Sequence, residues 1–206
     1  MKFKKIKNLF YEFIGRIIVP EELVNRNYEI LVHLSDTPTA IYGELRAFLK
    51  ELKPEYIIHT GDLVDNIKLE LYPKKIDLYE KFIKVIVNII NQNAIKKSWI
   101  VMGNHDNYQK IDLPDNMELI LDSDLIDVEN GSFSVSHYAL KCREYRSDYH
   151  LFGHDLMVDT QEYHGEYYLN GIEHIHIINL STGEILFIDY PKDTNDYRLN
   201  KYKIGI

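Results

Sequence analysis

Apolar and polar positions alternate along the chain with spacings that predict strands and helices in turn. Mostly apolar runs predict buried strands at Tyr28–Leu34, Tyr56–Thr60 and Trp99–Met102. Between these strands, apolar residues at three- and four-residue steps predict one helix over residues 41–52 and a longer one over 76–91. A strand–helix–strand–helix–strand order favours an α/β fold.

Beyond the third strand the apolar spacing changes to two, which is typical of strands with one buried face. Asn130-Gly131 is a hairpin-turn signal before the alternating segment. The segments that we expect to be strands here are Ser132–His137, Tyr149–Phe152, Ile172–Leu180 and Glu184–Tyr190, the last two forming a terminal hairpin. Several strands after a βαβαβ unit indicate an α/β sandwich rather than a doubly wound sheet.

The first residues have a helical pattern of their own. Apolar residues recur at helical spacing over residues 3–18, and Pro20 is expected to end that helix. We expect this basic helix to dock its apolar face on the domain rather than on an anionic surface. No repeat or linker divides the chain, so we expect one domain over residues 1–206, with a helical extension (1–26), a core that carries the motifs (28–156) and a β-rich C-terminal part (157–206).

Composition and charge exclude several classes of protein. A net charge of −8 disfavours sequence-independent nucleic-acid binding, which needs a basic surface. No apolar run is long enough for a transmembrane segment, and no signal peptide is expected. Cys142 is the single cysteine, so an internal disulfide is impossible and a cytoplasmic location is expected.

Polar side chains follow the end of each strand that we expect to be buried. Loops at the carboxyl ends of strands in α/β sheets converge on one crevice, where ligands bind. Carboxylates, an amide and imidazoles gathered in one crevice suit a divalent transition metal. The residues concerned are Asp36, Asp62, Asn104, His105 and Asp106 after the first three strands, and His137 and His154 at the ends of two later ones.

Each of these residues also has a plainer interpretation. A Gly-Asp pair is usually a turn, and an inward-facing histidine is usually a hydrogen-bonded core residue. We expect His33 and His59, which lie inside strands, to be core histidines of that kind. His174 and His176 share one strand face, which we expect to be exposed, although they are the best candidates for additional metal ligands.

In combination, these segments resemble the calcineurin-like metallophosphoesterase superfamily, whose pattern is D-x-H, G-D-x-x-D, G-N-H-[DE], a lone H and G-H-x-H. Gly61-Asp62-Leu63-Val64-Asp65 and Gly103-Asn104-His105-Asp106 match in full. The resemblance implies a four-layer αββα sandwich with two mixed β-sheets. Two positions depart from the family, because Pro38 and Leu156 stand where it has histidines.

The resemblance also implies two metal positions. One would use Asp62, Asn104, His137 and His154, all of which are present. The other would use Asp36, Asp62 and the two missing histidines. We therefore expect one tightly held Mn, Fe or Zn ion and a second position that is empty, weakly filled by hydrated Mg or Mn, or filled by substrate.

The resemblance gives His105 the role of contacting phosphate and protonating the leaving oxygen, with Asp36 or Asp106 orienting its ring. These features predict a hydrolase of a phosphate monoester or diester that uses a metal-activated water. The alternative is a protein-binding scaffold of the same fold with weakened or no catalysis. A nuclease is disfavoured by the acidic charge. The substrate is expected to be a small phosphate ester, and the oligomeric state stays open.

Overall fold

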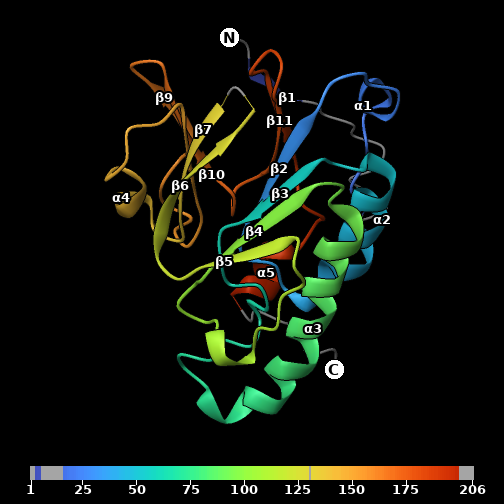
Figure 1. Cartoon of the computed structure of the whole chain (residues 1–206). Coiled ribbons are helices and arrows are strands. Elements are labelled where there is room, and N and C mark those ends of the chain that lie inside the picture. Colours follow the sequence, from blue (N-terminus) through green and yellow to red (C-terminus); the bar gives the residue numbers. More distant parts are fainter. Residues whose placement is uncertain (1–2, 6–15, 130, 200–206) are drawn as a thin grey trace.

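A computed structural model describes residues 3–5, 16–129 and 131–199. Two mixed β-sheets lie face to face in it (Figure 1). The larger sheet has the strand order β1-β12-β11-β2-β3-β4-β5, and the smaller one has the order β6-β7-β8-β10-β9. Strands of the larger sheet are β1 (Phe3–Lys5), β2 (Ile30–Leu34), β3 (Tyr56–His59), β4 (Lys97–Val101), β5 (Met117–Ile120), β11 (Ile175–Asn179) and β12 (Ile185–Ile188). Those of the smaller sheet are β6 (Ser123–Val128), β7 (Gly131–Ser136), β8 (Tyr149–Phe152), β9 (Gln161–Tyr163) and β10 (Glu166–Asn170).

Both faces of the larger sheet are covered by apolar side chains. Successive side chains of a strand point to opposite faces, and β2 has buried apolar side chains on both faces. Ile30 and Val32 join the core on the helix side, whereas Leu31 joins the core between the sheets. This explains why β2 reads as a continuous apolar run rather than an alternating one.

Helices form the outer layers (Figure 1). The outer face of the larger sheet is covered by α2 (Tyr42–Leu52) and α3 (Ile76–Asn93), whose buried side chains belong to the same core as Ile30. The smaller sheet carries the short α4 (Ala139–Cys142) on its outer side. The other short helices are α1 (Glu21–Val24), α5 (Thr194–Arg198) and the 3-10 turns η1 (Thr39–Ile41), η2 (Pro73–Lys75) and η3 (Tyr108–Lys110).

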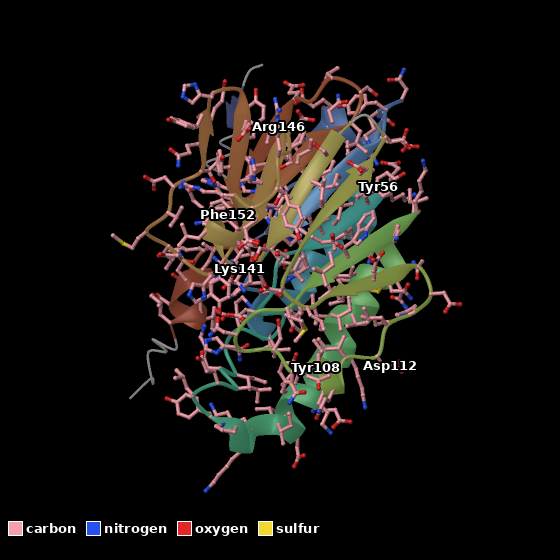
Figure 2. The ribbon with its side chains drawn as sticks, turned by 60° about the vertical axis from the view of Figure 1, so that its left-hand side comes forward. Tyr56, Tyr108, Asp112, Lys141, Arg146 and Phe152 are labelled. Atoms are coloured by element: carbon pink, nitrogen blue, oxygen red, sulfur yellow. The ribbon has the colours of Figure 1, made fainter. Side chains whose placement is uncertain are left out.

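Parallel pairing brings the ends of several strands to one edge. Strands β2, β3 and β4 run parallel, as do β7 and β8 in the other sheet. Figure 2 shows the common direction: Tyr56, where β3 begins, and Arg146, which precedes β8, lie toward the upper end, and Phe152, where β8 ends, lies lower. The loops that follow these strands therefore share one end of the molecule.

The sequence predictions hold for the central elements and fail at the N-terminus. The expected α/β fold with two mixed sheets is confirmed. The expected terminal hairpin corresponds to the antiparallel strands β11 and β12. The turn signal at Asn130-Gly131 lies between the antiparallel strands β6 and β7, although Asn130 lies outside the described residues. The helix expected over residues 3–18 is wrong where the chain is described. Phe3–Lys5 form a strand parallel to β12, and residues 16–20 are not helical. Residues 6–15 of that prediction lie outside the described residues. The edge of β12 offers backbone partners that local apolar spacing cannot reveal.

Among the described residues, none of the helices combines the length and the apolar character that crossing a bilayer requires.

Candidate metal centre

The loops after β2 and β3 are joined by backbone hydrogen bonds. The N–H of Asp36 donates to the carbonyl of Gly61 at 2.9 Å, and the N–H of Thr37 donates to the carbonyl of Asp62 at 3.0 Å. A third bond joins the N–H of Asp65 to the Thr37 carbonyl at 3.2 Å. The two carboxylates at the start of the site are thus placed by main chain rather than by a ligand.

Glycines allow two further loops to approach these carboxylates. A Cβ atom on Gly103 would overlap the carboxylate of Asp62, and one on Gly153 would overlap the side chains of Ser35 and Asp36. Any larger residue at either position would push the loop away from the site.

Three of the site residues have left-handed backbone conformations. The φ angles are 50° at Asp36, 55° at Asp62 and 68° at His154. Such conformations are uncommon for residues with a side chain and cluster at functional sites, where the surrounding structure holds them. The hydrogen bonds between the loops provide that restraint here.

The side chains of Asn104, His137 and His154 meet at one point beside Asp62. Asn104 Oδ1 lies 3.1 Å from His137 Nε2 and 3.0 Å from His154 Nδ1, and the two ring nitrogens are 3.2 Å apart. Asp62 Oδ2 lies 3.5 Å from His137 Nε2. Two ligands that are each about 2.1 Å from an ion, at right angles, are about 3 Å apart. The spacing of these atoms therefore fits ligands around one divalent cation.

Outer contacts direct the lone pairs toward that point. His137 Nδ1 lies 2.7 Å from the carbonyl oxygen of Thr60, which can only accept, so Nδ1 is the donor and Nε2 faces the site. Asn104 Nδ2 donates to the Glu70 carboxylate at 2.5 Å, which leaves Oδ1 facing the two histidines. Imidazole nitrogens, an amide oxygen and a carboxylate are a donor set that suits Mn, Fe or Zn.

The charges of Asp62 and His137 support each other. Burial alone would raise the pKa of Asp62, but the hydrogen bond and charge of His137 outweigh it and lower the pKa to about 2. Burial would lower the pKa of His137, but the hydrogen bond and charge of Asp62 raise it to about 9. In the metal-free protein the His137 ring is therefore protonated near neutral pH, and its positive charge lies next to the Asp62 carboxylate.

Asp36 lies beside the same point. One oxygen each from Asp36 and Asp62 and a ring nitrogen of His137 lie within 4.8 Å of one another. Asp36 Oδ2 accepts hydrogen bonds from Ser35 Oγ at 2.6 Å and from the backbone N–H of His154 at 3.1 Å. Asp36 therefore both faces the site and fixes the loop that carries His154.

His105 lies beside the candidate ligands, but its neighbours differ from those expected. Its ring hydrogen-bonds with Asn104, and Nδ1 is 3.6 Å from the Glu70 carboxylate. Among the described residues, neither Asp36 nor Asp106 hydrogen-bonds to this ring, so the expectation that one of them orients it is wrong. The loop after β3 brings Glu70 there instead, and no motif marks that residue. Burial lowers the pKa of His105, with the charge of Asp62 opposing.

Asp106 connects the loops rather than the ring. Its Oδ2 accepts from the backbone N–H groups of Asp62 (2.7 Å) and Gly103 (3.0 Å), and its Oδ1 accepts from those of Leu63 (3.1 Å) and from the Tyr79 hydroxyl (3.1 Å). Burial raises the pKa of Asp106 to about 7, with Asp62 adding to the rise and these backbone donors opposing it. Asp106 thus supports the site without facing it.

A third carboxylate, Asp65, lies next to Asp62. One oxygen each from Asp62 and Asp65 and a ring nitrogen of His105 lie within 4.8 Å of one another. Asp65 Oδ1 forms an ion pair with Lys68, and its buried Oδ2 has no hydrogen-bond partner. Burial and the charge of Asp36 raise the pKa of Asp65 to about 8, although Lys68 opposes them.

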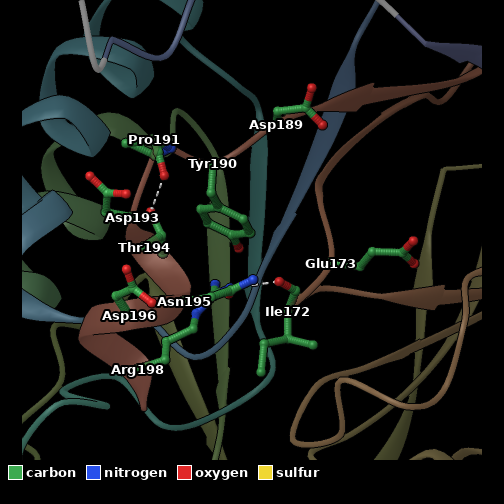
Figure 3. A pocket seen from close by; sticks show the side chains of 10 residues that line it. All are labelled: Ile172, Glu173, Asp189, Tyr190, Pro191, Asp193, Thr194, Asn195, Asp196 and Arg198. Atoms are coloured by element: carbon green, nitrogen blue, oxygen red, sulfur yellow. Dashed lines mark hydrogen bonds between the residues drawn. The ribbon is translucent and has the colours of Figure 1, made fainter. Parts of the chain in front are cut away.

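Residues near the C-terminus hold the Asp36 loop from behind. The buried Arg198 guanidinium donates to the carbonyls of Asp36 (2.7 Å), Ser35 (3.2 Å) and Ile172 (2.6 Å), and the Tyr190 hydroxyl accepts from the Ser35 N–H at 3.2 Å. Arg198 and Tyr190 also line a pocket of about 390 Å³ (Figure 3). Sequence analysis missed both, because a side chain that binds carbonyl groups leaves no motif.

Three further histidines, His33, His59 and His176, are fully buried in strands of the larger sheet. His33 contacts Thr60 Oγ1 at 2.9 Å and His176 Nδ1 at 3.1 Å, and His59 contacts Thr37 Oγ1 at 3.0 Å. Burial lowers the pKa of both His33 and His59 to about 3, so each is a neutral core histidine, as expected. The expectation of an exposed His176 is wrong, because β11 lies between β12 and β2 and the side chain is fully buried.

One family model and several solved structures are similar to this chain. The family model described as calcineurin-like phosphoesterase matches residues 31–203. An archaeal phosphodiesterase structure is 15% identical, with a TM-score of 0.55, covering 78% of this chain and 99% of its own. Yfce, a phosphoesterase from E. coli, is 11% identical, with a TM-score of 0.46, and the match covers 76% of this chain and 96% of Yfce. A variant of Vps29 from Entamoeba histolytica is 15% identical, with a TM-score of 0.46, and the match covers 76% of this chain and 95% of that variant. No curated protein sequence matches.

Proposed function

Because the chain belongs to the calcineurin-like phosphoesterase family, we propose that it hydrolyses a phosphate monoester or diester with the help of a divalent metal. The observation that carries this proposal is the group of four side chains, Asp62, Asn104, His137 and His154, with three ligand atoms 3.0–3.2 Å apart. When bound, Mn, Fe or Zn would polarise the phosphate and make a nearby water more acidic.

The side chains of the site have separate roles in this proposal. Asp62, Asn104, His137 and His154 hold the ion, and Asp36 fixes the His154 loop. His105 lies next to them and is 9% exposed, and both of its ring nitrogens lie within 3.3 Å of Asn104 Nδ2. In this proposal its ring binds the phosphate and donates a proton to the leaving oxygen. Burial lowers the pKa of this ring. The protonated ring is therefore a stronger acid, although a smaller fraction of it carries the proton at neutral pH.

Hydrolysis of nitrophenyl monoesters and diesters, with Mn²⁺, Ni²⁺ and Zn²⁺ added in turn, tests the activity. We expect metal-dependent turnover by the wild-type protein. His105→Ala should lower kcat by about 10²–10⁴, the usual contribution of a general acid, while its metal content stays unchanged. His164→Ala, at an exposed site, is the matched control. An unchanged kcat in His105→Ala would disprove the role of His105.

One observation favours a second function, a protein-binding scaffold with weakened or no catalysis. Pro38 and Leu156 stand where the family has metal ligands, and Pro38 is buried while Leu156 is 42% exposed. A scaffold would show no turnover with any of the three metals and either ester class. The retained His105 beside four ligand side chains favours the enzyme, because a scaffold has no need of a reactive imidazole there.

A further inference from the structure

The half of the site that lacks its histidines has an excess of buried negative charge. The exposed fractions of Asp36, Asp62 and Asp65 are 2%, 2% and 1%. Burying carboxylates together is costly unless positive charge lies among them. His137 lies on the intact side of Asp62, with Nε2 3.5 Å from Asp62 Oδ2, and it does not contact Asp65. The Asp65 side therefore needs a cation of its own.

Lys68 brings an ammonium group to that side. Its Nζ forms an ion pair with Asp65 Oδ1, and the lysine side chain is only 17% exposed. The backbone at Lys68 has φ 52°, an uncommon conformation for lysine, and its carbonyl accepts the N–H groups of Leu71 and Tyr72. The loop is thus folded so that the lysine points inward instead of extending into solvent.

The ammonium lies beside the carboxylate pair of Asp65 and Asp62. Asp65, its partner, is hydrogen-bonded through its N–H to Thr37, next to Pro38, which stands in place of a family ligand. The Asp65 carboxylate also lies within 4.8 Å of ligand atoms of Asp62 and His105. The second oxygen of Asp65 is buried without a hydrogen-bond partner. This oxygen is therefore available to a further cation when Lys68 contacts the first.

We propose that the Lys68 ammonium, paired with Asp65 beside Asp62 and His105, supplies the positive charge that a second metal ion would bring, so that the site combines one exchangeable cation with one fixed cation. This inference rests on the proposed function and deepens it. A compact ammonium on a flexible stem can contact a carboxylate and a phosphate oxygen in turn. The chain thus lacks two histidine ligands but has the ammonium group of Lys68 nearby. A bound ester phosphate would then contact a metal ion on one side of Asp62 and this ammonium on the other.

The number of bound ions tests the proposal without any measurement of turnover. Metal-free protein, titrated with Mn²⁺ by isothermal calorimetry and checked by elemental analysis after dialysis, should bind one ion per chain. Lys68→Met removes the charge at nearly the same length, which frees Asp36, Asp62 and Asp65 for a second, hydrated ion. We expect two ions per chain in this variant. Lys84→Met, at a lysine 68% exposed on α3, should bind one, like the wild type.

A second variant guards against loss of folding. Lys68→Met leaves Asp65 without a partner, so thermal unfolding is measured first. Lys68→Gln keeps a hydrogen-bond donor for Asp65 while removing the charge, and it should also bind two ions. Two ions in the wild type, or the same number in the wild type and in a folded Lys68 variant, would overturn the proposal. If the wild type binds one ion and hydrolyses esters while the Lys68 variants also bind one, only the role of Lys68 fails and the proposed function stands.

Discussion

On one side of Asp62 the neighbouring side chains are imidazoles and an amide, whereas on the other side they are carboxylates and an ammonium. The loops that carry the two sides are nevertheless built alike, with main-chain hydrogen bonds between them and left-handed backbone at the key residues. The shape of the site therefore does not depend on its ligands. Ligands can be lost from one side while the backbone that would present them remains.

The largest effect that can test this contrast is the loss of a ligand from the intact side. His137→Ala removes a ring nitrogen and the partner that holds the charge of Asp62. Changes to outer partners of a ligand cost about 10–100-fold in metal affinity, so we expect a loss of more than about 100-fold for the ligand itself. Calorimetry with Mn²⁺ measures it, with His164→Ala as the control. Wild-type affinity in His137→Ala would show that the ion is held elsewhere.

Proton competition gives a second test of the intact side. The pKa of His137 is raised to about 9 by Asp62, so its ring carries a proton below that pH in the metal-free protein. The ion must displace this proton, and its affinity should therefore rise with pH, by up to tenfold per unit below pH 9. We expect the Kd for Mn²⁺ to fall by about 100-fold from pH 6 to pH 8.

The released proton can be counted directly. Calorimetry at pH 7 in two buffers with different ionisation enthalpies should report close to one proton released per ion bound. A Kd that stays constant from pH 6 to pH 8, with no proton released, would contradict the ion pair of Asp62 and His137 as the place where the metal enters.

Removing the negative charge of Asp36, on the carboxylate side of the site, should reduce the affinity for Mn²⁺ less than the loss of His137. Asp36→Asn keeps oxygen and shape, so Ser35 and the His154 N–H retain an acceptor. We expect the tightly bound ion to remain, with an affinity about tenfold lower because a nearby negative charge is lost. The Mn²⁺ titration used above measures it. Complete loss of the ion in Asp36→Asn would break the contrast, since both sides would then be needed to hold it.

The sequence predicted the elements that depend on local pattern. Apolar spacing found β2, α2, β3, α3 and β4 because each buries a face whose period is visible within a few residues. The family pattern then located Asp62, Asn104, His137 and His154. In contrast, the strand at Phe3–Lys5 was predicted as helix, because the partner that decides its conformation is β12, about 180 residues away along the chain.

The supporting residues were beyond prediction for a similar reason. Arg198 recognises backbone carbonyls, which every residue possesses, so nothing in its neighbourhood indicates that it binds the Asp36 loop. Lys68 and Glu70 lie in a loop without a motif, and only the folded loop shows that both point toward the site. Side chains that act through geometry rather than through a family pattern are recognised only in the folded structure.

Glu70 gives the smallest expected effect, and it tests whether the intact side needs its outer contact. Its carboxylate accepts from Asn104 Nδ2, but the side chain is 56% exposed, and exposed ionic contacts contribute only about 0–1 kcal/mol. Glu70→Gln should therefore weaken Mn²⁺ binding by about threefold. Glu80→Gln, whose partners are Lys84 and Lys110 on the surface, should leave it unchanged. A loss of about 100-fold in Glu70→Gln would instead indicate that Glu70 is itself a ligand, so that the intact side would hold its ion with five side chains.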